Sequence, residues 1–147
     1  MQIKTKKLTI QTKKGPEFID ITEEVVSFIS ESGTRNGIVS ICSQHTTAAI
    51  KINENEPLLI NDMENFLKKL AGVENYYSHN DFSIRTEHMT PEESQNGHSH
   101  CQHLLLSTSE TIPIVEGKLH MGRWQRIFLV ELDHARQRQV VIQMVGE

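Results

Sequence analysis

The sequence predicts an α+β fold: a single compact domain over residues 1–147 that is mainly antiparallel β-sheet or sandwich with a few helices packed on it. Three observations support this prediction. A chain of 147 residues is most simply one domain and can bury a core without disulfide or metal staples. Segments with a strand pattern outnumber segments with a helical pattern. Neighbouring strand segments are joined by short links, which favours an antiparallel sheet with helices on one side.

Two strands are expected at the start of the chain. Residues 3–12 alternate in polarity and place Leu8 and Ile10 on the buried face. Lys14-Gly15-Pro16 has the composition of a turn, and residues 17–21 follow as a second, shorter strand.

A helix is predicted next, because Thr22 is a good N-cap residue and Glu23 and Glu24 follow in the first turn, where the helix dipole favours carboxylates. Its buried stripe would consist of apolar residues: Val25, Val26, Phe28 and Ile29. Gly33 suits the left-handed residue that ends a helix.

The middle of the chain predicts two more strands, a long helix and a long loop. The strands are residues 37–42 and 48–52, and Pro57 suits the first turn of the helix. Its apolar residues recur at helical spacing: Leu58, Leu59, Met63, Phe66, Leu67 and Leu70. The polar stretch 72–97 follows, and a loop of this length inside a compact domain is usually functional or mobile.

The last third contains one ambiguous segment and three strands. Residues 98–106 fit a short helix capped by Asn96, but Leu104 to Leu106 are also compatible with a strand. The strands are expected over residues 111–115, 125–132 and 138–145. The indole of Trp124, at the start of the second of these, is expected to anchor the core.

Composition excludes several classes of function. The net charge is −4 and the basic residues are dispersed, which argues against nucleic-acid binding and against an anionic membrane surface. No apolar run approaches membrane-spanning length and no secretory h-region is present, so we expect a cytoplasmic protein. The two cysteines, Cys42 and Cys101, form no CxxC motif and are expected to be small buried thiols.

Three of the eight histidines lie in dense polar motifs: His45, His79 and His100. Imidazole is the commonest side-chain metal ligand, and three imidazoles from separate segments suit an open, catalytic type of metal site. The alternative is that each is a structural residue, and no HExxH spacing decides between the two. His103 would share a face with His100 on a helix, and His98 would do so on a strand. The remaining three are interpreted as surface residues: His88, His120 and His134.

Other polar groups have both a structural and a functional interpretation. Asn53 to Glu56 most simply form a strand exit and a helix cap, although Glu54 or the amides could face a ligand. The hydroxyls of Thr46 and of Ser107 to Ser109 suit phosphate, but hydroxyl-rich turns are commonly only turns. Arg136 could neutralise a phosphate or be a surface charge. No P-loop or dinucleotide fingerprint is present.

An ordered set of motifs resembles the YjbQ-like family, which is described as secondary thiamine-phosphate synthase. The set is Gln44-His45-Thr46-Thr47-Ala48, Ile52-Asn53-Glu54-Asn55, Asp62-Met63, His79-Asn80-Asp81, Ser99-His100, Thr108-Ser109, Ile112-Pro113-Ile114, Gly122-Arg123-Trp124-Gln125 and Gln143-Met144-Val145-Gly146-Glu147. The resemblance implies a compact α+β fold, a homotrimer and a metal site made by His45, His79 and His100. It also implies a capacity, as a main or a side activity, to couple hydroxymethylpyrimidine diphosphate to thiazole phosphate with release of pyrophosphate.

Roles for further residues follow from this resemblance and the chemistry. Glu54 and Asp81 are the candidate acid–base groups. The candidates for binding the small phosphorylated substrate are Thr46, Asn53, Ser109 and Arg136. Imidazole ligands favour Zn²⁺, with Mg²⁺ as the alternative because diphosphate chemistry commonly uses it.

Two other functions remain open at this point. One is a zinc-type hydrolase of a small phosphorylated or ester substrate, and the other is a noncatalytic metal or phospho-ligand binding protein. The chain also departs from the common pattern of the family. Gln102 stands where many members carry lysine, Ser107 where they carry glycine, and His134-Ala135 where they carry Gly-Pro. The absent lysine bears on phosphate affinity more than on metal binding.

Overall fold

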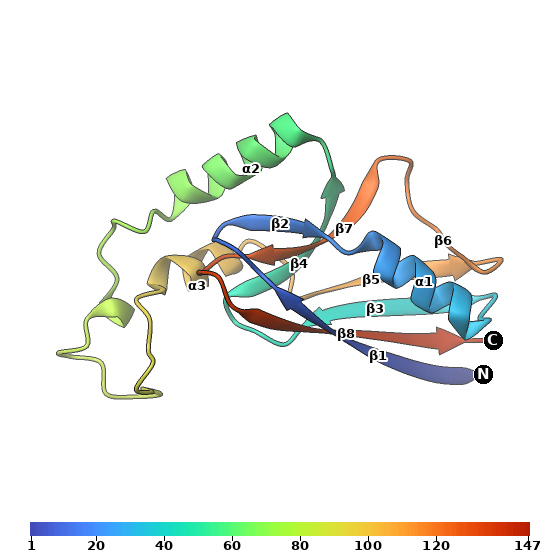
Figure 1. Cartoon of the computed structure of the whole chain (residues 1–147), viewed down its shortest axis with the longest axis horizontal. Coiled ribbons are helices and arrows are strands. Elements are labelled where there is room, and N and C mark those ends of the chain that lie inside the picture. Colours follow the sequence, from blue (N-terminus) through green and yellow to red (C-terminus); the bar gives the residue numbers. More distant parts are fainter.

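Two antiparallel sheets form the body of the molecule (Figure 1). The computed structural model describes residues 1–147. The larger sheet contains five strands in the order β1 (Gln2–Gln11), β8 (Gln137–Gly146), β3 (Gly37–Ser43), β5 (Ser109–Val115) and β6 (Lys118–Leu119). The smaller sheet contains three strands in the order β2 (Glu17–Asp20), β7 (Gln125–Glu131) and β4 (Ala48–Glu54). The predicted α+β fold dominated by antiparallel strands is confirmed.

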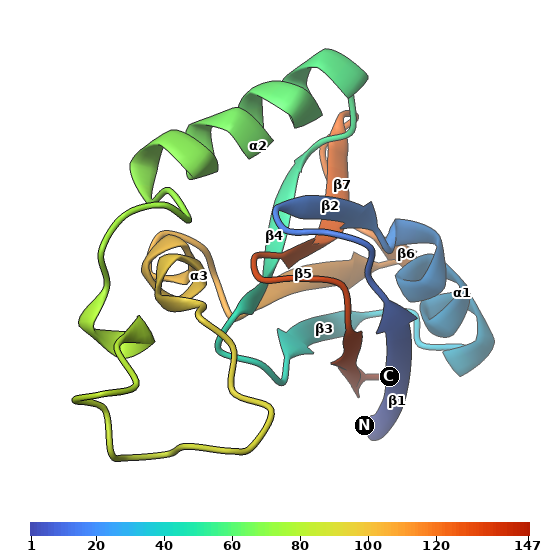
Figure 2. The same ribbon diagram turned by 60° about the vertical axis from the view of Figure 1, so that its left-hand side comes forward.

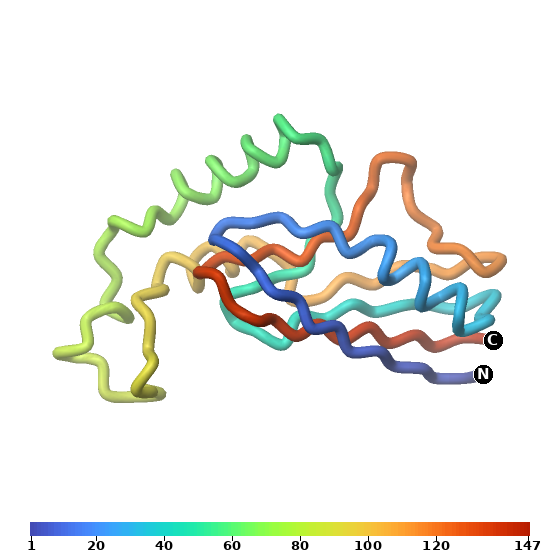
Figure 3. The backbone as a smooth tube through the Cα atoms, in the orientation of Figure 1, coloured from blue at the N-terminus to red at the C-terminus, as the bar shows by residue number.

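The two ends of the chain meet in the larger sheet. Gln2 pairs with Gly146, and the pairing continues to Gln11 opposite Gln137, so β1 and β8 run antiparallel over their whole length. The tube in Figure 3 shows the two termini next to each other at one end of the molecule. Along β8, alternate side chains from Arg138 to Met144 are buried, as the period of two in a strand requires.

The main core lies between the two sheets and helix α1 (Thr22–Ser32). It contains 15 buried apolar residues, contributed by β3, β4, β5, β7 and β8, by the helix and by Ile21 just before it. A second cluster of five covers the other face of the smaller sheet: Ala49, Leu67, Phe128, Val130 and Leu132. Strand β7 is therefore buried on both faces, which explains its unbroken apolar run Ile127 to Val130.

Helix α1 begins one residue earlier than predicted, at Thr22 itself. Ile21 occupies the N-cap position, and the Asp20 carboxylate, not the Thr22 hydroxyl, accepts hydrogen bonds from the start of the helix, from Thr22 N and Oγ1 at 2.9 and 2.6 Å. Gly33 ends the helix with a φ of 71°, as predicted. Val26 is 42% exposed and does not belong to the buried stripe, because it lies on the solvent side of the helix.

Helix α2 (Pro57–Leu70) begins at Pro57, as predicted, and Glu56 caps it by accepting hydrogen bonds from two backbone N–H groups, of Leu58 and Leu59. Its apolar stripe is only partly buried. Leu67 packs into the second cluster, whereas three others are exposed: Leu58, Phe66 and Leu70. Figure 1 shows the reason: the helix stands away from the sheets along most of its length.

The ambiguous segment is helical, as α3 (Gly97–His103). Asn96 precedes it, but its side chain donates to Asp133 and makes no hydrogen bond to the helix. The long loop between α2 and α3 contains one short 3₁₀ helix, η1 (Ser78–Asn80), and Figure 2 shows it running around the outer side of α3. No helix in this structure combines the length and the apolar composition needed to cross a bilayer.

Two expectations about individual side chains are wrong. Trp124 is 62% exposed and stacks under the guanidinium of Arg123 at 4.6 Å, because it lies in the connection before β7 and not within the sheet. Cys101 is exposed and Cys42 is half-buried, so neither is the buried thiol that the sequence predicts. The outward face of α3 places Cys101 in solvent.

Candidate functional site

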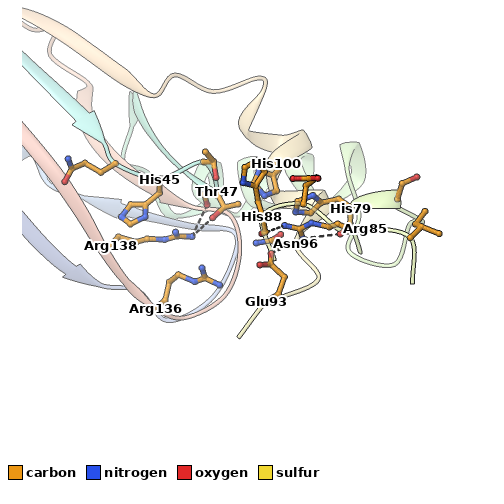
Figure 4. A pocket seen from close by; sticks show the side chains of 15 residues that line it. His45, Thr47, His79, Arg85, His88, Glu93, Asn96, His100, Arg136 and Arg138 are labelled. Carbon is orange, nitrogen blue, oxygen red and sulfur yellow. Dashed lines mark hydrogen bonds and ion pairs between the residues drawn. The ribbon is translucent and has the colours of Figure 1, made fainter. Parts of the chain in front are cut away.

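A polar pocket of about 970 Å³ opens where the loop after β3, the long loop, α3 and the start of β8 meet (Figure 4). Of its 15 lining residues only Ile84 is apolar. The others are Gln44, His45, Thr46, Thr47, Ser78, His79, Arg85, Glu87, His88, Glu93, Asn96, His100, Arg136 and Arg138. The pocket therefore suits a polar, charged ligand and not an apolar one.

His79 and His100 form a pair inside this pocket. Their ring centroids are 4.7 Å apart with an angle of 70° between the planes. His79 lies on η1 and His100 on α3, so two segments that are distant in sequence bring the rings together. The Nε2 atom of His79 is buried and has no hydrogen-bond partner. A buried polar atom without a partner is uncommon and points to a missing ligand or water.

The protonation state of His100 follows from its surroundings. Burial lowers its pKa below the ordinary value of 6.5, and the neighbouring His79 lowers it further. His100 is therefore neutral near pH 7, which is the state that can bind a metal or accept a proton.

His45 is also neutral, but it is held differently. Burial and the charge of Arg138 lower its pKa. Its Nε2 accepts a hydrogen bond from the backbone N–H of Gln139 at 2.8 Å. In a neutral imidazole the other nitrogen then carries the proton, so Nδ1 of His45 is a hydrogen-bond donor and not a free lone pair.

The three predicted metal ligands therefore line one pocket without forming one ligand set. No group of three or more His, Cys, Asp or Glu side chains is placed to hold a metal ion. The unpartnered Nε2 of His79 and the neutral His100 beside it fit a metal. His45 does not fit in this arrangement, since ligation would require its hydrogen bond from Gln139 to break.

Arg138 lies at the base of the pocket and is 1% exposed. Its guanidinium donates to both carboxylate oxygens of Glu131, which is 0% exposed, and also to the Thr47 hydroxyl at 2.9 Å. A buried charge needs such partners. The donors of Arg138 are thus used on buried partners, and Glu131 largely neutralises its charge without any ligand.

The other two arginines of the pocket are also paired. Arg85 donates to Glu93 at 2.9 Å and to the backbone oxygen of His88 at 3.0 Å, which ties the long loop to itself. Arg136 pairs with Asp133 at 2.8 Å. Arg136 is the most accessible of the three, with a side chain 34% exposed. It is the arginine best placed to meet an incoming anion.

Some of the predicted site residues lie elsewhere. The pocket includes five of them: His45, Thr46, His79, His100 and Arg136. Asp81 faces a neighbouring depression and accepts hydrogen bonds from Ser83. Asn53 and Glu54 lie at the end of β4, and Ser109 begins β5 opposite Cys42; none of the three lines this pocket.

Five charged or titratable residues of the pocket were not among the predicted site residues: Arg85, Glu87, His88, Glu93 and Arg138. Arg138 had a detectable pattern, because it shares the inward register of β8 with Val140 and Ile142. An arginine at an inward strand position requires a buried partner. The other four lie in the long loop, where no periodicity predicts which side chains face inward.

Comparisons with known proteins give a consistent result. The model of a family described as UPF0047 protein YjbQ-like matches residues 6–147. A UPF0047 protein of Methanothermobacter thermautotrophicus is 37% identical over 147 residues, which cover 100% of this chain and 95% of that protein. The UPF0047 protein YugU of Bacillus subtilis is 35% identical over 142 residues, covering 96% and 98%.

Solved structures show the same likeness. A protein of unknown function from Sulfolobus solfataricus, described as YbjQ-like, superposes with a TM-score of 0.88 at 33% identity and covers 99% of both chains. A hypothetical protein from Aeropyrum pernix superposes with a TM-score of 0.86 at 33% identity, covering 98% of this chain and 99% of that one.

Proposed function

This chain belongs to the UPF0047 family of YjbQ-like proteins, and from that premise we propose that it is an enzyme acting on a small phosphorylated substrate. One observation carries the proposal: a pocket of about 970 Å³ in which histidines and arginines gather and only Ile84 is apolar. Such a lining favours an anionic ligand with several oxygen acceptors, which is the character of a phosphate or a diphosphate.

The pocket offers distinct groups to the two ends of such a substrate. Arg136 and the exposed hydroxyl of Thr46 would bind phosphate oxygens at one end, with the Nδ1–H of His45 as a third donor. His79 and His100 would act at the other end, around the reacting bond. Figure 4 shows this separation, with Arg136 and His45 on one side and the histidine pair on the other.

The specific reaction that we propose to test first is the coupling of hydroxymethylpyrimidine diphosphate to thiazole phosphate. The thiazole nitrogen attacks the methylene carbon of the pyrimidine, the carbon–oxygen bond breaks, and its electrons leave with pyrophosphate. The pocket would have to stabilise the charge that develops on the leaving oxygens. Arg136 and Arg85 are the pocket cations that would contact these oxygens. Neutral His100 would not repel a divalent metal ion that binds beside it.

A divalent metal fits this proposal at His79 and His100, with Zn²⁺ favoured by the imidazole donors and Mg²⁺ as the alternative. When bound, it would supply positive charge for the leaving pyrophosphate. His79 and His100 would hold the metal near the reacting bond, and Arg136 would bind outer phosphate oxygens of the substrate.

A second candidate is the hydrolysis of a small phosphorylated or ester substrate. The observation that favours it is the position of neutral His100 beside His79, because an imidazole with a lowered pKa can accept a proton from an attacking water. Coupling and hydrolysis would use the same phosphate-binding groups and differ in the nucleophile that reaches the substrate.

One experiment separates these functions. The protein is incubated with hydroxymethylpyrimidine diphosphate, with and without thiazole phosphate, in Mg²⁺ or Zn²⁺, and the products are identified by mass spectrometry. Thiamine phosphate together with pyrophosphate supports coupling. Release of phosphate without a carbon–nitrogen product supports hydrolysis. Binding of pyrophosphate by calorimetry without turnover of either kind would support the noncatalytic alternative and refute the enzyme proposal.

Matched variants tie the result to the pocket. His100→Ala and Arg136→Ala are expected to lower the rate about 10²-fold or more, as the loss of an acid–base or charge-stabilising group commonly does. His120→Ala is the control, because His120 is exposed and lies outside the pocket.

A further inference from the structure

A second pocket, of about 430 Å³, lies against a different face of α3 and shares no lining residue with the first. It opens between α3, the C-terminal end of α2 and the segment around Asp133. His98 and Gln102 are four residues apart on α3 and so share the face that lines it, whereas His100 points to the first pocket.

Gln102, which lines this second pocket, carries an unpaired acceptor. The residue is 2% exposed, and its side-chain Nε2 donates to the backbone oxygens of Leu67 and Ala71 at 3.1 and 2.9 Å. Because a carbonyl oxygen can only accept, the two contacts fix the orientation of the amide. The Oε1 atom therefore cannot exchange places with Nε2, and it is buried without a hydrogen-bond partner.

His98 presents a second unpaired acceptor. The Ser99 hydroxyl has one hydrogen and donates it to the backbone oxygen of Leu132 at 2.7 Å. It can then only accept from Nε2 of His98, 3.1 Å away. Neutral His98 is thus protonated at Nε2, so its Nδ1 carries a lone pair, and that atom is also buried without a partner.

Two residues that line one pocket thus each carry a buried acceptor that no donor of the chain satisfies. Leaving such groups unpaired costs free energy, so native structures satisfy them. The pocket volume of about 430 Å³ is far larger than the roughly 30 Å³ that one water occupies in the liquid. It has room for a small organic ligand beside both residues.

The charge around the pocket favours a cation. Helix α2 ends there, and Ala71 and Gly72 line the wall, so the negative end of the helix dipole faces the ligand. Glu74 adds a carboxylate, while Lys68 adds one opposing charge. Asp133 contributes little, because Arg136 and His134 already pair with it.

We propose that this second pocket binds a small organic cation that carries N–H donors, an ammonium or an amidinium group. One N–H would donate to Oε1 of Gln102 and another to Nδ1 of His98, with the positive charge toward the end of α2 and Glu74. This site does not depend on the function proposed for the first pocket, and the two can fail separately.

The test uses ¹⁵N-histidine-labelled protein at pH 8, where an ordinary imidazole is neutral. Long-range ¹H–¹⁵N spectra report the tautomer of His98 and the shift of its Nδ1. The probes are methylammonium and guanidinium, with tetramethylammonium as the matched control of equal charge and no N–H. Such small probes are expected to bind with dissociation constants on the order of millimolar at best.

The expected result is an Nε2–H tautomer of His98 whose Nδ1 shift changes saturably with methylammonium or guanidinium and not with tetramethylammonium. An Nδ1–H tautomer would overturn the proposal, because the acceptor would not exist. An equal response to all three cations would overturn it by showing that charge alone is sensed. The absence of any saturable response would show that ordered water alone satisfies the acceptors.

Surface variants test the charge argument without disturbing the helix. Glu74→Gln is expected to weaken methylammonium binding by about two- to fivefold, and Lys68→Ala to tighten it by a similar factor, as partly screened charges do. Lys69→Ala is the control, because Lys69 is the neighbouring exposed lysine of α2 and does not line the pocket. If Lys68→Ala and Lys69→Ala changed methylammonium binding equally, the proposed effect of the Lys68 charge in the pocket wall would be refuted.

Discussion

Arg138 of β8 and Glu131 of β7 form a bidentate ion pair that links the two sheets in the interior of the molecule. The two residues are 1% and 0% exposed, and Thr12 and Thr47 complete their hydrogen bonding. Arg138 also lines the first pocket, so one member of the pair that joins the sheets belongs to the site as well.

The Arg138–Glu131 pair is expected to respond asymmetrically to mutation. Arg138→Met leaves the Glu131 carboxylate buried and unpaired, and should lower the free energy of unfolding by about 3–5 kcal/mol. The double variant Arg138→Met/Glu131→Leu removes both charges and should recover much of that loss. Urea unfolding measures both. A double variant no more stable than the single one would contradict this account.

Metal binding should depend on two of the three predicted histidines. We expect purified protein loaded with Zn²⁺ to retain metal in the wild type and in His45→Ala, and to lose it in His79→Ala and His100→Ala. The reason is that His45 uses Nε2 to accept from Gln139, whereas His79 has a free nitrogen beside His100. Elemental analysis after gel filtration measures the content. Loss of zinc from His45→Ala, with the fold intact by circular dichroism, would show that His45 rearranges to ligate.

The stability of the protein should fall on mild acidification, partly through His45. Its pKa in the folded state is lowered from 6.5 by burial and by Arg138, so the unfolded chain binds the proton more readily than the folded one. The part of the unfolding free energy that depends on neutral His45 is therefore fully present above about pH 6.5. It is lost as the pH falls through the pKa of His45 in the folded state. Unfolding free energies of the wild type and His45→Asn, measured between pH 8 and 5, should converge toward the acid end. A constant difference would exclude the linkage.

Asp20 should stabilise the fold down to a much lower pH. Burial alone would raise its pKa, but hydrogen bonds from Arg126, Thr22 and Asn55 lower it from 3.8 to about 2. Its contribution is present above pH 3.8 and is lost as the pH falls toward 2. At pH 7, Asp20→Ala should cost about 1 kcal/mol, mainly from the lost contacts at the start of α1. Chemical unfolding at pH 7 and pH 2.5 measures both values, and the cost should be smaller at pH 2.5.

The homotrimer implied by the family resemblance stays a prediction, and the structure suggests where to test it. Leu58, Phe66, Leu104 and Leu105 are exposed on α2 and around the end of α3, at 75, 62, 83 and 58%. Apolar surface of this kind is commonly covered by another chain. We expect light scattering to give close to three times the 16.8 kDa mass of one chain. Phe66→Asp should lower that mass if this surface lies in the interface, and Val26→Asp on α1 is the matched control.

The sequence predicted the fold well because its periodic segments are strongly specified. The alternation in β8 and the unbroken apolar run of β7 report burial directly, and Pro57 and Gly33 mark helix boundaries through backbone chemistry. The apolar stripe of α2 was misleading, since its spacing predicts an amphipathic helix but cannot say whether a partner from the same chain covers it.

The site was harder to predict from the sequence than the fold. Composition and polar context singled out His45, His79 and His100, and the structure brings all three to one pocket. The hydrogen bond from Gln139 to His45 could not be foreseen, because it depends on how the loop after β3 lies against β8. Arg85 and Glu93 belong to an irregular loop, where no repeating pattern indicates which side chains face inward.

The wall that this loop gives to the first pocket has a consequence for how the family can diversify. Residues 78 to 93 supply His79, Arg85, His88 and Glu93 to the pocket, and the Arg85 side chain ties this loop to itself. The opposite wall rests on β8 and on the buried pair that joins the sheets. Substitutions or length changes in the loop can therefore alter which ligand is accepted without destabilising the core, so selection can act on specificity and on folding almost independently.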